Sequence, residues 1–124
     1  DHVKCDENAV KPLIRASMSA ACCNNKLWVF GGQDDDNNKL CDLWCYDMAK
    51  CAWSQIKCNQ GDYWPCPRSG HSAVTWNSKM YIFGGIYELT KELNDLVCYD
   101  FASMKFSGND DQGAVCSGQI PGEI

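Results

Sequence analysis

Short apolar runs alternate with clusters of turn-forming residues along most of the chain. In the second half, the segments 71–76, 80–83, 96–99 and 105–107 are rich in β-branched and aromatic side chains, which favours strands. The residues between these segments are mostly Asn, Ser, Asp and Gly, which supply turns. Each run is too short for an ordinary helix. The pattern predicts an all-β fold made of four short antiparallel strands joined by short loops.

The same unit occurs twice. The stretch "LWVFGG" from Leu27 to Gly32 returns as "MYIFGG" from Met80 to Gly85, at an offset of 53 residues. Between positions 15 and 58, sixteen residues are identical to the residue 53 positions later, without a gap. This degree of identity indicates a duplication. We therefore expect two similar four-stranded units, and propeller blades are built from such units.

We expect the double glycines to have a structural role in each unit. A blade's second strand lies between neighbouring blades, so it carries apolar residues on both faces. We expect it to turn sharply at the glycine pair, ending at Gly85 in the second unit, where positive φ or close packing excludes a Cβ. Bulky aromatic residues at matched positions of the two units are expected to fill the space between blades: Trp28, Phe30, Tyr46 and Trp53, with their counterparts Tyr81, Phe83, Tyr99 and Phe106.

At these positions the sequence resembles the kelch repeats. The resemblance covers about residues 12–111 and includes the lead-in "PRSGHSAV" from Pro67 to Val74. The first unit departs from this lead-in, with Ser17 and Met18 at the Gly and His positions. The second unit has Phe where Trp is more usual. The positions that carry the kelch signature are Gly31, Gly32, Tyr46, Trp53, Gly84, Gly85, Tyr99 and Phe106.

The resemblance implies a β-propeller of about five to seven blades. We assign 12–64 to the first repeat and 65–113 to the second, with 1–11 as an extension or the end of a preceding blade and 114–124 as a tail or the start of a third. Two blades cannot close a ring, so each open flank should expose aromatic surface. We therefore expect a fragment of a larger multidomain protein; the alternative is that other copies complete the ring.

Kelch repeats typically act as protein-interaction scaffolds, so the resemblance implies a protein or peptide partner. The loops 33–41 and 86–94 should lie on the face that binds ligands in this family, together with the lead-ins to each repeat and the segment 61–65. The candidate binding residues on this face are Arg15, Arg68, Tyr63, Trp64, Asp35 and Tyr87.

Each candidate has an alternative role. The arginines recur at one blade position, so they could equally hydrogen-bond carbonyls between blades. Tyr63 and Trp64 could pack beneath their loop instead of anchoring a peptide. The acidic loop 34–36 lacks the spacing of an EF-hand and is expected to be solvated.

An enzyme on a kelch propeller, such as a sugar oxidase or a sialic-acid mutarotase, is the alternative function. A copper oxidase needs a cluster of His and Tyr ligands, and the chain has two histidines. We expect His71 to be structural and the aspartates that recur at strand ends to cap turns. No catalytic residue, metal or cofactor is predicted.

Charge and cysteine content limit the classes of partner and the cell compartment that we expect. The net charge of −5 disfavours a nucleic-acid partner, and no apolar run is long enough to span a membrane. No signal-peptide pattern is visible and the chain begins without Met, which favours a cytoplasmic protein and a fragment. The chain is cysteine-rich, with ten cysteines, and these are expected to be reduced and structural, partly disulfide-bonded, or, least of all, metal-bound.

Overall fold

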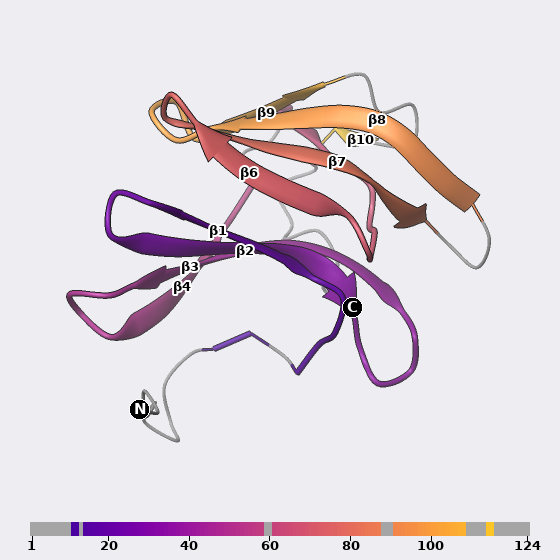
Figure 1. Cartoon of the computed structure of the whole chain (residues 1–124), viewed down its shortest axis with the longest axis horizontal. Helices are drawn as coiled ribbons and strands as arrows, with labels where there is room; N and C mark the ends of the chain where they lie inside the picture. Colours follow the sequence, from indigo (N-terminus) through magenta and orange to yellow (C-terminus); the bar gives the residue numbers. More distant parts are fainter. Residues whose placement is uncertain (1–10, 13, 59–60, 88–90, 109–113, 116–124) are drawn as a thin grey trace.

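The computed structural model describes residues 11–12, 14–58, 61–87, 91–108 and 114–115. All regular elements in these ranges are strands (Figure 1). The first sheet has the order β1-β2-β3-β4 and the second has the order β6-β7-β8-β9, each antiparallel throughout. Each is the meander that the sequence predicts. No segment within the described ranges forms a helix long and apolar enough to cross a membrane.

The strand bounds repeat between the two sheets. The first sheet consists of β1 (Ser19–Cys23), β2 (Lys26–Gln33), β3 (Lys39–Asp47) and β4 (Ala52–Ile56). The second consists of β6 (Ser72–Trp76), β7 (Lys79–Tyr87), β8 (Lys91–Asp100) and β9 (Lys105–Gly108). A two-stranded ribbon joins β5 (Tyr63–Trp64) to β10 (Ala114–Val115). The sheets fall within the predicted repeats, whose exact boundaries remain predictions.

The turns between strands follow from local side-chain chemistry. Asn24-Asn25 and Asn77-Ser78 form two-residue hairpin loops with φ between 54° and 63°, a conformation that matches the twist of the flanking strands. Asp47 accepts hydrogen bonds from the Ala49 and Lys50 amides, and Asp100 accepts the equivalent bonds in the second sheet. These two aspartates cap turns as expected.

The glycine pairs do not end their strands, so the expected sharp exit at Gly85 is wrong. Instead β2 and β7 continue to Gln33 and Tyr87, and each shows a shift in register at the pair. All four glycines have positive φ, between 68° and 105°. A bulge at this point bends the strand while its pairing continues. The expectation that these glycines need positive φ is confirmed.

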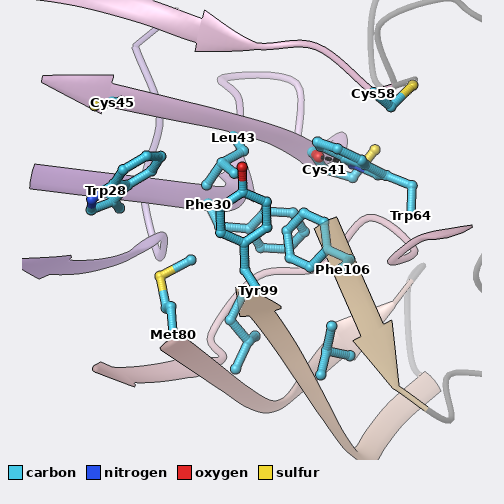
Figure 2. Packing of buried hydrophobic residues seen from close by; sticks show 12 residues of the cluster. Trp28, Phe30, Cys41, Leu43, Cys45, Cys58, Trp64, Met80, Tyr99 and Phe106 are labelled. Carbon is cyan, nitrogen blue, oxygen red and sulfur yellow. Dashed lines mark hydrogen bonds between the residues drawn. The ribbon is translucent and has the colours of Figure 1, made fainter. Parts of the chain in front are cut away.

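The core lies between the two sheets (Figure 2). Phe106 of β9 contacts the rings of Phe30, Trp64 and Tyr99 at centroid distances of 5.6, 4.8 and 4.7 Å. Burying each such ring stabilises the fold by about 1.5–3 kcal/mol. Burial, with the nearby Cys45, raises the pKa of Tyr99 to about 12. The expectation that aromatic residues fill the space between blades is confirmed for Trp28, Phe30, Tyr99 and Phe106. It is wrong for Phe83, which is 53% exposed because no described sheet covers its side of the second sheet.

The cysteines divide into two groups. Cys58 is disulfide-bonded. The other described cysteines form no disulfide: Cys22, Cys23, Cys41, Cys45, Cys51, Cys66 and Cys98. Partial disulfide bonding was one of the alternatives, and it describes this arrangement. Cys5 and Cys116 lie outside the described residues.

Candidate interaction surface

The recurring arginines are buried inside the sheets. Arg68 has no exposed side-chain surface and forms a bidentate ion pair with Asp95 of β8, at 2.8 and 3.0 Å. It also donates to the carbonyl oxygen of Gly84 at 3.2 Å. Arg15 makes the equivalent contacts with Asp42 at 2.7 Å and with the carbonyl of Gly31 at 3.1 Å. Asp42 and Asp95 therefore pair with arginines rather than capping turns.

The backbone of Arg68 links the second repeat to the first sheet. Its amide donates to the carbonyl of Leu40 at 3.0 Å, and its carbonyl accepts from the Gly32 amide at 2.8 Å. A Cβ on Gly31 would lie 2.8 Å from the same carbonyl oxygen. The side chain thus holds β8 while the backbone holds β2 and β3. The alternative role for the arginines was hydrogen bonding to carbonyls between blades. Each guanidinium does bond a carbonyl, but one of its own sheet, Gly31 for Arg15 and Gly84 for Arg68.

Trp64 is also an internal residue. It is buried, and its indole nitrogen donates to the carbonyl of Cys41 at 2.7 Å. The strand β5 that carries it lies against β9. Tyr63, on the same strand, is half-buried. Packing beneath the loop, the alternative role given to this pair, describes Trp64 better than a peptide anchor does.

Asp35 lies in the connection between β2 and β3, and Tyr87 is the last residue of β7, which pairs with β8 as β2 pairs with β3. Asp34 organises the first loop, because its carboxylate accepts from the amides of Asp36 and Asn38 at 3.0 and 2.9 Å. The bond from the Asn38 amide is the main reason that the pKa of Asp34 is lowered. Asp35 is exposed beside it and Tyr87 is half-buried. Of the predicted binding residues, these two and Tyr63 remain accessible.

The acidic loop offers no metal site in this structure. Among the described residues, no group of three or more His, Cys, Asp or Glu side chains is arranged to hold a metal ion. Asp34 instead directs its oxygens to the amides of its own loop.

The second sheet has an exposed apolar face, which we call the open flank. It lies on the side of the sheet that faces away from the first sheet, as the antiparallel register requires. Its most exposed apolar side chains are Val74 at 60%, Trp76 at 69%, Phe83 at 53% and Leu96 at 51%. Exposed aromatic surface was expected at each open flank, and this face confirms it for the second sheet. On the outer face of the first sheet the expectation is wrong, because Val29 and Trp44 are buried there.

The offset of 53 residues explains the open flank. Phe83 and Leu96 correspond to Phe30 and Leu43 of the first sheet, which are completely buried against the second sheet. The equivalent faces of the two sheets therefore carry matching side chains. Among the described residues, the face of the first sheet is covered by the second sheet, and that of the second sheet is exposed. The individual flank residues were not among the predicted site residues. Their signal was the alternation in "SAVTW", where Val74 and Trp76 share one side.

Comparison with known proteins identifies the repeat. A family model described as the KLHDC2/KLHL20/DRC7 Kelch-repeats domain matches residues 1–121. The chain is 36% identical over 106 residues to protein ral2 of Schizosaccharomyces pombe, covering 81% of this chain and 17% of that protein.

Two further relatives have the same pattern of partial coverage. Alpha-scruin of Limulus polyphemus is 30% identical over 90 residues, covering 69% of this chain and 9% of that protein. Human host cell factor 1 is 33% identical over 105 residues, covering 73% of this chain and 5% of that protein. The chain therefore spans less than a fifth of each of these relatives. The matched residues, together with the two duplicated four-stranded sheets, establish that this chain belongs to the kelch-repeat family.

Proposed function

We propose that this chain is part of a protein-interaction scaffold, a piece of a larger kelch propeller that presents loops to a protein partner. The observation that carries the proposal is the open flank on the second sheet. Contiguous exposed apolar surface marks sites of association. On the first sheet the equivalent face is covered by a neighbouring sheet, so we propose that a further blade covers the open flank in the longer protein.

The partner-binding surface in this proposal is the end of the sheets that carries Asp35 and Tyr87. A rigid sheet with variable loops suits recognition, because binding residues commonly sit on loops held by a rigid scaffold. Arg15, Arg68 and Trp64 are left out of the proposed surface because their side chains are buried. Tyr63 is kept as a secondary candidate because it is half-buried.

A binding role is proposed in preference to an enzymatic one. Among the described residues His71 is the one histidine, and it is buried between the sheets. Its imidazole is therefore inaccessible to a substrate in solution. Nothing in the described site favours the sugar oxidase or the mutarotase, and we propose no cofactor.

We also propose that the protein resides in the cytoplasm. The seven thiols that form no disulfide support a reducing compartment, where disulfides are uncommon. The disulfide at Cys58 is the observation that opposes it. Lysis of the cells in urea with N-ethylmaleimide, followed by mass spectrometry, tests this, because buried thiols such as Cys41 then react as well. Alkylation at all seven positions is expected, and extensive disulfide bonding would contradict the assignment.

The open flank is tested by light scattering on the 124-residue chain, with and without reductant. We expect polydisperse association that Phe83→Asp reduces. Met48→Asp, which changes an exposed side chain in the β3–β4 turn away from the flank, is the matched control and should leave association unchanged. A discrete trimer would mean that copies of this chain complete a ring with one another. A clean monomer that neither variant alters would contradict an association surface on this face.

The loop surface is tested in the longer protein with a photo-crosslinking amino acid at Asp35 or Tyr87, and at Met48 as the control position. Discrete protein adducts at the two loop positions, absent at the control, are expected. Equal labelling at all three positions would remove the loops from the proposal.

A further inference from the structure

His71 occupies the junction between the first and second sheets. Its Nε2 atom lies 2.8 Å from the carbonyl oxygen of Phe30, and its ring stands edge-on to the Phe30 ring at a centroid distance of 5.6 Å. A Cβ on Gly31 would lie 2.9 Å from its Cε1 atom, and one on Gly85 would lie 3.0 Å from its Cβ. The side chain is thus wedged between the glycine bulges of both sheets.

The contact with Phe30 fixes the tautomer. A carbonyl oxygen only accepts hydrogen bonds, so Nε2 must carry the proton and Nδ1 holds the lone pair. Nδ1 is buried and has no hydrogen-bond partner among the described residues. A proton added there would create a buried cation without an acceptor, which is costly.

The charges around the ring do not offset that cost. Arg68, from the lead-in to β6, is paired with Asp95 of β8. Arg15, which donates to the Gly31 carbonyl, is paired with Asp42 of β3. The carboxylates of Asp42 and Asp95 are therefore each neutralised by an arginine. From β2 the ring meets Phe30 and Gly31, and from β7 it meets Gly85, none of which is charged.

The effect on titration follows from this setting. The pKa of His71 is lowered to about 4, mainly by burial and in smaller part by the positive charge of Arg68, while the hydrogen bond to Phe30 acts in the opposite direction. An imidazole exposed to water titrates near 6.5. Opening the junction would therefore let the ring take up a proton that the closed junction excludes.

We propose that His71 is an acid-sensitive joint, at which proton uptake by Nδ1 in mildly acidic solution weakens the packing of the first sheet against the second. The folded-state pKa lies below the exposed value, so the contribution of the closed junction is complete above about pH 6.5. It is lost progressively as the pH falls towards 4. At pH 5 the ratio of open to closed junctions should be about 30-fold higher than at pH 7.5, from 1.5 pH units of proton linkage. This inference depends on the junction alone and not on the proposed partner.

Amide hydrogen exchange on the 124-residue chain tests the proposal. The amides of Gly32 and Arg68 donate across the junction, whereas those of Gln33 and Ser69 donate within one sheet. Corrected for intrinsic exchange rates, protection at the junction amides should fall about 30-fold between pH 7.5 and pH 5, and by less at the other two.

His71→Gln is the matched variant, since its side-chain amide can donate to Phe30 without titrating in this range. Protection in this variant should not show the pH-dependent loss. An equal loss in both proteins, or none in the wild type, would overturn the proposal. Direct NMR titration of His71 in the wild type keeps the proposal falsifiable when the variant does not fold: a pKa near 6.5 in the folded chain would also overturn it.

Discussion

Replacing Arg68 with alanine tests whether the recurring arginine is structural. The change removes a fully buried guanidinium and leaves the carboxylate of Asp95 without its two hydrogen bonds at 2.8 and 3.0 Å. Breaking one side of a buried ion pair costs about 3–5 kcal/mol. Because the Asp95 side chain is 10% exposed, some hydration remains, and a loss of about 3 kcal/mol is expected. This is a large fraction of a typical unfolding free energy of about 5–15 kcal/mol.

Urea unfolding followed by tryptophan fluorescence measures that loss. The double variant Arg68→Met/Asp95→Leu removes both charges, and should recover more than half of the stability lost by the single change, since no buried charge is left unpaired. Arg15→Ala removes the equivalent pair in the first sheet and should cause a similar loss. A loss below about 1 kcal/mol in Arg68→Ala would refute the reasoning, as would a double variant less stable than the single one.

Three further outcomes are expected from matched positions. In urea unfolding, Phe30→Ala should lower the unfolding free energy by about 3–5 kcal/mol. Phe83 holds the same position in the second repeat but is 53% exposed, so Phe83→Ala should lower it by less than about 1 kcal/mol. Equal losses would mean that the open flank is covered in the isolated chain. Gly85→Ala should lower the midpoint of thermal unfolding more than Gly61→Ala does. Both glycines have positive φ, but a Cβ on Gly85 would lie 2.9 Å from the Ser69 carbonyl oxygen, while one on Gly61 would meet nothing within 4 Å. Similar midpoints would contradict the close approach of Ser69 to Gly85. Cys41, whose pKa burial raises to about 12, should resist alkylation at pH 8 until urea unfolds the chain, and rapid labelling in the folded chain would show that the site is accessible.

The repeat was sufficient to predict most of the fold. The offset of 53 residues placed four strands in each unit, and the aromatic residues at its matched positions indicated which faces meet. Phe30 is an example, because it was expected to fill the space between blades and is completely buried there, whereas its counterpart Phe83, expected to do the same, is 53% exposed. The bulge at Gly84-Gly85 was missed, since a strand that bends and continues has the same local residues as a strand that ends.

The candidate site was harder to predict for a physical reason. Recurrence shows that a position has the same role in each unit, but it does not distinguish a surface role from a buried one. Arg68 recurs because it binds Asp95, 27 residues away, and that contact depends on the register of β8. Trp64 likewise depends on the position of Cys41 in another strand. These long-range contacts have no local signature, so composition alone pointed to the surface.

The backbone bonds at Arg68 also determine which stretch of chain could be exchanged between kelch proteins. The Gly32 amide and the Leu40 carbonyl of the first sheet are satisfied by the residue that opens the second repeat. A segment that ends just before this lead-in would leave the Gly32 amide and the Leu40 carbonyl without their hydrogen-bond partners. A segment that ends after the lead-in would keep both hydrogen bonds. Recombination should therefore tolerate crossovers that keep a lead-in with the sheet preceding it, so the transferable module is displaced along the chain from the four strands that define each sheet.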